Sequence, residues 1–169
     1  RDHDNPPRRG RFEDNRTDIE AGVGALAPHA PNGTVVIGHS LGTNRVLYYQ
    51  FEAQDPRVRG LVLLAGPGNA FEWNAALFGR ERAQAQVAEA QRLVEQGKRG
   101  EWMAVDLGPL GKAWYTAEYL LSLRGPASRS DPFANIARVR VPILIVHGTG
   151  DRLADHRIAA RLKAAAQGA

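Results

Sequence analysis

The fold is decided by residues 34–52, which read TVVIGHSLGTNRVLYYQFE. The apolar run Val35–Ile37 predicts a buried strand, and the segment that carries Val46 and Leu47 is compatible with a helix. Between the two lies a tight Gly-His-Ser-Leu-Gly sequence with Ser40 in its middle. We therefore expect a strand, a sharp turn with the serine at its apex, and a helix whose N-terminus can stabilise a developing negative charge.

Two glycines flank this serine at equal distances. A residue at the apex of a strand-to-helix turn is forced into a sparsely populated backbone conformation, and the strand and helix then run very close together. Gly38 and Gly42 leave room for that approach. The amide of Leu41, at the start of the helix, is placed to donate to the oxygen of a tetrahedral intermediate, as half of an oxyanion hole. The alternative is an ordinary turn made of small residues.

Composition excludes several classes of protein. With 169 residues, 43% hydrophobic and 24% charged, the chain suits one globular domain, and no apolar run is long enough to span a membrane. The net charge is +4, but the basic residues are scattered among acids, so we expect no nucleic-acid partner. The absence of cysteine excludes disulfides, thiolate metal sites and a cysteine nucleophile. It leaves the compartment open, with the cytoplasm slightly favoured, and oligomeric state is not indicated.

Further elements follow in a regular order. Thr17 and Glu20 have the spacing of a capping box, which predicts a helix from Thr17 to about Leu26. Buried strands are predicted at 58–65 and 141–146, and a final helix at 155–166. Because strands and helices alternate, we expect an α/β fold with a parallel sheet and flanking helices.

The alternation of strands and helices is interrupted between residues 69 and 138, where no strong strand is apparent. Amphipathic helices are predicted at 81–96, ending at Gly97, and at 113–123. Asp131 is expected to cap a short helical turn that has proline in its first position. Aromatic side chains in this region either pack the helices together or line an apolar pocket beneath a helical lid; they include Trp73, Trp102 and Trp114.

Three motifs together resemble the α/β-hydrolase superfamily: GHSLG at 38–42, VRGLVLLAG at 58–66 and VPILIVHGTGD at 141–151. The segment FEDNRTDIEAG at 12–22 also resembles the helix that precedes the turn in that family. The resemblance implies a hydrolase core at 1–68 and 139–169, interrupted by a helical cap insertion at 69–138.

The resemblance also assigns roles. Ser40 would be the nucleophile, activated by a histidine base that a carboxylate holds in the right tautomer. Asp151 occupies the place of that acid, although a loop aspartate can also serve only to bond backbone amides. Asp155 is the rival carboxylate, but its position is typical of the cap of the last helix. A small-molecule acyl substrate is implied, and no metal or organic cofactor.

The catalytic histidine has no candidate in this chain. The family places it after the acid, beyond one further strand, whereas the residues after Asp151 are mostly taken by the final helix. His39 is expected to point away from the serine and His147 to pack or position its neighbours; the other histidines are His3, His29 and His156. The strand that normally supplies the second oxyanion donor is not found before Ser40 either. We therefore expect an incomplete α/β-hydrolase fold, an internal piece of a longer hydrolase that is inactive by itself.

Three functions are compatible with these patterns. The first is a serine hydrolase of the carboxylesterase type that cleaves an ester, thioester or related acyl bond through an acyl-enzyme. The second is a non-catalytic binding module with the same fold. The third is a cofactor-free enzyme of this fold with non-hydrolytic chemistry.

Overall fold

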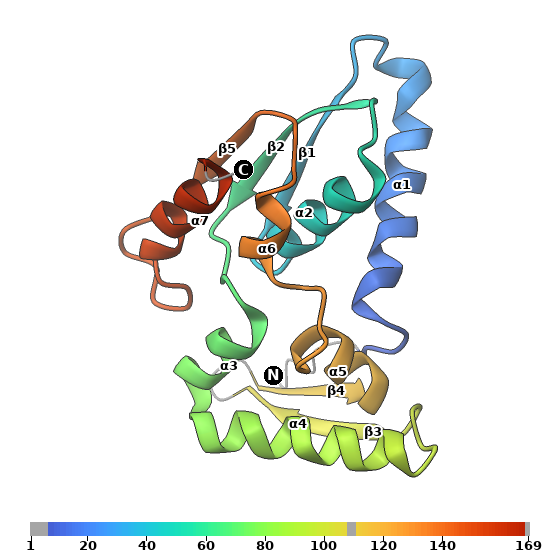
Figure 1. The fold of residues 1–169 in the computed structure, drawn as a ribbon, viewed down its shortest axis with the longest axis vertical. Helices are drawn as coiled ribbons and strands as arrows, with labels where there is room; N and C mark the ends of the chain where they lie inside the picture. The colour runs from blue at the N-terminus through green and yellow to red at the C-terminus, as the bar shows by residue number, and fades with distance from the viewer. Residues whose placement is uncertain (1–6, 108–110, 168–169) are drawn as a thin grey trace. The chain divides into compact units, whose positions relative to one another are not determined.

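The computed structural model describes residues 7–107 and 111–167 (Figure 1). Its contacts divide the chain into two compact units, each with its own core. One unit, the sheet unit, comprises Glu13–Asn69 and Ser130–Ala169. The other, the inserted unit, comprises Ala70–Arg129 together with the residues up to Phe12. The division differs from the expected one in that residues 130–138 belong with the sheet, whereas residues 7–12 belong with the inserted unit.

The sheet unit is built on three parallel strands in the order β1-β2-β5 (Figure 1). The register shifts once, between Thr34 and Val35, and is regular beyond it: Val36 lies opposite Leu61, which lies opposite Ile143. The predicted parallel α/β sheet is therefore confirmed. The strands are β1 (Thr34–His39), β2 (Val58–Leu64) and β5 (Ile143–Val146).

Helices of the sheet unit are α1 (Asn15–Leu26), α2 (Gly42–Ala53), α6 (Pro132–Ile136) and α7 (Arg157–Gln167). The predicted start of α1 at Thr17 is wrong. A 3-10 turn, Phe12–Asp14, runs directly into the helix, and Asp14 has helical dihedral angles without a side-chain capping bond. Because the chain is already helical there, Thr17 lies in the first turn and cannot act as the N-cap.

One face of the sheet carries the core. Leu61 and Leu63 are almost completely buried and pack with Leu47 and Tyr49 of α2, with Ile136 and with Leu162. On the opposite face Val35 and Ile37 are about 60% exposed (59% and 61%), and Leu144 is 58% exposed. Side chains alternate between the faces of a strand, so the continuous apolar runs of β1 and β5 leave one apolar face uncovered within this chain.

The inserted unit contains α3 (Ala70–Phe78), α4 (Arg80–Glu95), α5 (Ala117–Arg124) and an antiparallel hairpin of β3 (Trp102–Asp106) and β4 (Lys112–Thr116). Helix α4 ends as predicted. Gly97 has φ 78°, its amide bonds Val94 O at 3.0 Å, and the Lys98 amide bonds Leu93 O at 2.8 Å.

The expectation of a purely helical insertion is wrong. Residues 113–116, predicted as the start of a helix, belong to β4 and pair with β3, so that Tyr115 lies opposite Met103 and Trp114 opposite Ala104. Both strands alternate in burial, as a half-buried strand does. Trp102 and Trp114 therefore stand on the exposed face, 44% and 42% exposed, rather than between helices.

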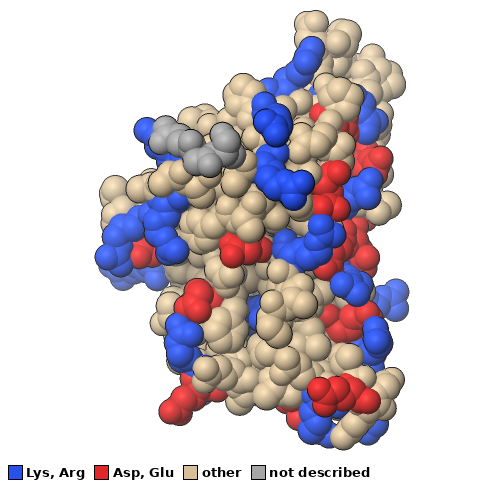
Figure 2. Space-filling view, viewed as in Figure 1, with Lys and Arg blue, Asp and Glu red and all other residues tan. Residues whose placement is uncertain are grey.

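Charged side chains of both signs are interspersed over most of the face shown in Figure 2. Several of the basic groups form ion pairs within their own unit, such as Arg92 with Glu89 and Arg157 with Asp155. Within the described ranges, no helix combines the length and apolar character needed to cross a bilayer.

Candidate active site

Ser40 lies between the end of β1 and the start of α2, with its side chain exposed. Its φ of 52° is in the left-handed region, which a residue with a side chain seldom adopts, as expected for the apex of this turn. Hydrogen bonds hold the backbone in this conformation. The Ser40 amide donates to Leu64 O at 2.9 Å, and Ser40 O accepts from both the amide and the hydroxyl of Thr43, at 2.9 and 2.8 Å.

The two glycines beside the serine are not equivalent. A Cβ on Gly38 would lie 2.5 Å from Gly42 O and 2.8 Å from the Thr43 amide nitrogen, both of them backbone atoms. A Cβ on Gly42 would meet no described atom within 4 Å beyond its own helical turn. The predicted steric need for glycine is therefore confirmed at Gly38, because the backbone of α2 lies where its Cβ would be. The same prediction is wrong at Gly42, because no atom of the strand lies where a Cβ on Gly42 would be.

Leu41 is the N-cap residue of α2, with φ −59° and ψ −19°. Its amide makes no hydrogen bond with any residue in the described part of the chain. The first amides of a helix lack partners within the helix and carry the positive end of its dipole. An oxygen anion beside Ser40 would therefore meet a suitable donor here.

Asp151 lies in the loop that follows β5, and it is tightly held. Its Oδ1 accepts hydrogen bonds from the amides of Leu153 at 2.8 Å and Ala154 at 3.0 Å. Its Oδ2 lies 3.2 Å from Nε2 of His147. The amides of Ala154 and Leu153 lower the pKa of Asp151 below its usual value, so the carboxylate is ionised at neutral pH.

His147 contacts Asp151 in this loop. Its side chain is only 3% exposed, and its Nε2 lies 3.2 Å from both the Asp151 carboxylate and the carbonyl of Ala154. A ring nitrogen that faces two acceptors carries the proton and donates to them. This agrees with the packing or positioning role considered for His147, but its contact with Asp151 was not predicted. The four-residue spacing of the two side chains was the available signal.

Ser40 and Asp151 lie at the same edge of the sheet. They follow β1 and β5, and the carboxyl ends of parallel strands meet at one edge. One strand, β2, separates the two, so β1 and β5 are about 10 Å apart in the sheet. The rival carboxylate Asp155 is engaged at the start of α7, where it accepts from the Arg157 amide at 2.9 Å and pairs with the guanidinium at 2.7 Å.

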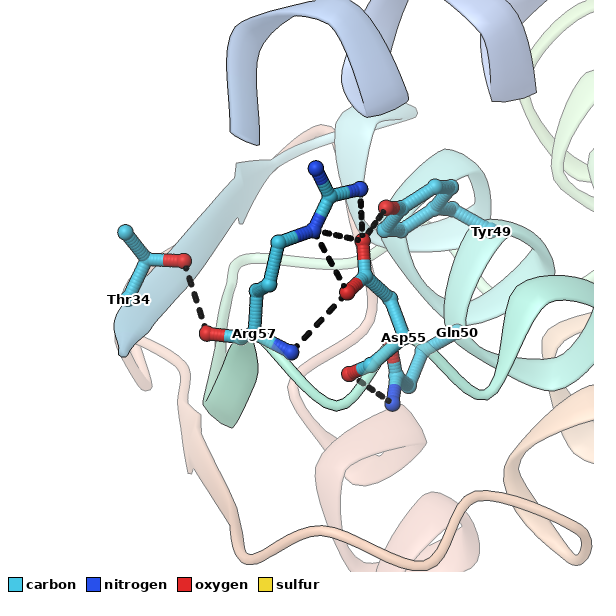
Figure 3. Close-up of polar contacts among 5 residues, drawn as sticks. All are labelled: Thr34, Tyr49, Gln50, Asp55 and Arg57. Carbon is cyan, nitrogen blue, oxygen red and sulfur yellow. Dashed lines mark hydrogen bonds and ion pairs between the residues drawn. The ribbon is translucent and has the colours of Figure 1, made fainter. Parts of the chain in front are cut away.

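A second polar cluster lies at the opposite edge of the sheet (Figure 3). Asp55, in the turn between α2 and β2, is buried and bonds two nitrogens of the Arg57 guanidinium, at 2.9 and 2.6 Å, and the Tyr49 hydroxyl. The bonds from Arg57 lower the pKa of Asp55, whereas burial and the bond to Asp55 raise the pKa of Tyr49 to about 12. The side chains of Gln50 and Thr34 extend the cluster by donating to the backbone carbonyls of Asp55 and Arg57. The cluster therefore connects α2 with the start of β2 and does not belong to the serine site.

Over the ranges that the structure describes, no three His, Asp or Glu side chains gather as a metal site would require. The expectation that no metal is needed stays a prediction.

A sequence model of the alpha/beta hydrolase family matches residues 2–169. The chain belongs to this family. Two solved structures share the alpha/beta hydrolase fold with it. The esterase domain of a Rhodothermus marinus protein is 22% identical with a TM-score of 0.51, and covers 90% of this chain. A Paleococcus ferrophilus monoacylglycerol lipase is 18% identical with a TM-score of 0.64, and covers 92%.

This alpha/beta hydrolase chain spans only 53% and 61% of the length of those two proteins. No curated protein matches it. At these identities the two structures bear on the fold alone. The predicted family is thus confirmed, whereas the roles of Ser40, Leu41 and Asp151 and the capping role of the insertion remain predictions.

Proposed function

We propose that this chain carries the nucleophile and the acid of a serine hydrolase that cleaves an ester, thioester or related acyl bond. The observation that carries the proposal is the state of Ser40: an exposed residue, at φ 52°, directly before a helix N-terminus. The position of Asp151 at the same sheet edge supports it. Both solved relatives are named for ester-cleaving activity, one as an esterase and the other as a monoacylglycerol lipase.

In the proposed reaction the Ser40 oxygen attacks the acyl carbon while its proton passes to a histidine that this chain does not supply. The negative charge that develops on the acyl oxygen is stabilised by the Leu41 amide. Collapse of the tetrahedral intermediate expels the protonated alcohol or thiol and leaves an acyl-serine. A water molecule, deprotonated by the same histidine, then releases the carboxylic acid and restores Ser40.

Asp151 is suited to hold that histidine. A carboxylate has about four lone-pair positions. The amides of Leu153 and Ala154 occupy Oδ1, and His147 takes one position on Oδ2. The second position on Oδ2 is left for an incoming imidazole N–H. The side chain is 22% exposed, so an imidazole can approach while the rest of the carboxylate stays fixed.

A fluorophosphonate probe tests the nucleophile in the full gene product that contains this segment. We expect labelling of the native protein and of Ser128→Ala, and complete loss of labelling in Ser40→Ala. Labelling that survives Ser40→Ala would reject the assignment. The absence of labelling in a folded native protein would favour the binding module or the non-hydrolytic enzyme.

The acid is tested by turnover of a p-nitrophenyl ester. Asp151→Asn is expected to lower kcat by about three to four orders of magnitude, because the histidine loses its orienting charge. Asp155→Asn is the matched control and is expected to keep full activity. Equal activity of the two variants would move the acid role to another carboxylate.

A further inference from the structure

The chain crosses between the two units at three points, and the side chain of Asn44 is hydrogen-bonded beside two of them. The chain leaves the sheet unit after Asn69 and returns to it at Ser130. The Nδ2 group of Asn44 donates one hydrogen bond to Gly68 O and a second to Ser130 O, each at 2.9 Å. All three residues belong to the sheet unit, and each bonded carbonyl stands within one residue of a point where the chain crosses between units.

Asn44 is rigidly placed for this role. It is completely buried in the first turn of α2, four residues after Ser40. Its Oδ1 lies 3.1 Å from the hydroxyl of Thr43, whose single proton is shared with the closer Ser40 O at 2.8 Å. Both N–H donors of the carboxamide are engaged, which fixes its orientation.

The connection that leaves the sheet unit after Asn69 is also tightly packed. A Cβ on Gly66 would come within 2.7 Å of the Thr43 hydroxyl, and a Cβ on Gly68 within 2.9 Å of an Ile158 methyl carbon. Gly68 has φ 76°, a conformation that favours glycine. The carbonyl of Gly68 is thus presented to Asn44 by a backbone that has little freedom.

We infer that Asn44 is a positioning residue that holds two of the three connections between the units, those at Asn69 and Ser130, on the helix that follows Ser40. Loss of its two donors would release these two of the three crossing points together, since no other side chain bonds both carbonyls among the described residues. The inference goes beyond the proposed function and does not depend on the chemistry of Ser40.

The test compares Asn44→Asp with Gln50→Glu. Both change a buried amide of α2 into an acid, but Gln50 bonds only the Asp55 carbonyl, away from the connections. In Asn44→Asp the carboxylate faces two carbonyls that have lost their donor. We expect trypsin to cut the Arg129–Ser130 bond about tenfold faster than in the native chain, as two lost hydrogen bonds predict. The rate in Gln50→Glu should stay within about twofold.

Cleavage after Arg59, inside β2, serves as the internal reference for global unfolding. An acceleration at Arg129 no greater than that at Arg59 would overturn the inference. Should Asn44→Asp not fold, Asn44→Ser retains one donor and is expected to give an intermediate rate. A native rate in Asn44→Ser would refute the clamp.

Hydrogen exchange tests whether Asn44 holds the two connections at the same time. Peptides covering residues 66–70 and 129–132 should both exchange about tenfold faster in Asn44→Asp. Faster exchange in only one of the two peptides would contradict a common anchor.

Discussion

Replacing Gly38 by alanine places one carbon atom where the structure has no room. The new Cβ would lie 2.5 Å from Gly42 O, 2.7 Å from Gly42 C and 2.8 Å from the Thr43 nitrogen. These are backbone atoms in the first turn of α2, so no side chain can rotate away. The only relief is a shift of the helix relative to β1, which would also disturb the hydrogen bonds that hold Ser40 at φ 52°.

The expected cost follows from these contacts. Inserting a methyl group into a packed site typically costs about 1 to 3 kcal/mol, and contacts with fixed backbone place this site at the upper end. We therefore expect Gly38→Ala to lower the free energy of unfolding by about 3 kcal/mol, a large share of a typical domain's stability. Gly42→Ala is the matched control. Its Cβ meets no described atom within 4 Å beyond its own turn, and alanine favours the helix by up to about 1 kcal/mol.

Urea unfolding followed by circular dichroism measures both changes. The reasoning predicts that Gly38→Ala is less stable than Gly42→Ala by about 3 kcal/mol or more, with similar slopes against urea. A difference below about 0.5 kcal/mol, which is the size of an ordinary surface substitution, would refute the steric argument.

Three further predictions concern the polar contacts of α2. The contribution of Tyr49 to the free energy of unfolding should be complete below pH 10 and lost as the pH rises towards 12, because the pKa of Tyr49 is higher in the folded than in the unfolded state. Unfolding measured across this pH range should show a loss of about 2 to 3 kcal/mol that is absent in Tyr49→Phe. Asp55→Ala should cost about 1 to 3 kcal/mol at pH 7, since it leaves the buried Tyr49 hydroxyl without its acceptor. In the native chain the contribution of Asp55 should fade as the pH falls below about 4, because its pKa is lower in the folded state. Equal stability of variant and native chain at pH 7 would contradict it. Thr43→Val removes the hydroxyl bonded to Ser40 O and should cost about 1 to 2 kcal/mol in urea unfolding, whereas an unchanged value would show that the bond contributes nothing.

Elements that depend on neighbouring residues were predictable. The end of α4 at Gly97 follows from a backbone conformation that glycine adopts without strain, and the start of α6 from Asp131, whose side chain accepts from the Phe133 amide at 2.9 Å. The β3–β4 hairpin was missed because aromatic and apolar residues at 113–123 also fit a helical spacing. The choice was made by pairing with residues 102–106, which local spacing does not encode.

In the candidate site, too, the features set by neighbouring residues were predicted and those set by tertiary contacts were not. The turn at Ser40 was predicted, and so was the place of Asp151 after the third strand. The predicted need for glycine at position 42 was wrong, since it depends on which backbone atoms lie near that Cα in the folded chain. The contact of His147 with Asp151 depends on how the loop closes, which the spacing alone does not fix.

By itself the sequence determined a strand, a serine-bearing turn and a helix, since apolar periodicity and flanking glycines act over a few residues. It also determined that the strands run parallel, because each is separated from the next by a helix or more. Only the tertiary structure decided what Asn44 binds: its two acceptors lie 24 and 86 residues further along the chain. A side-chain amide can satisfy its donors with any carbonyl that folding brings near, so no local pattern could single out these two.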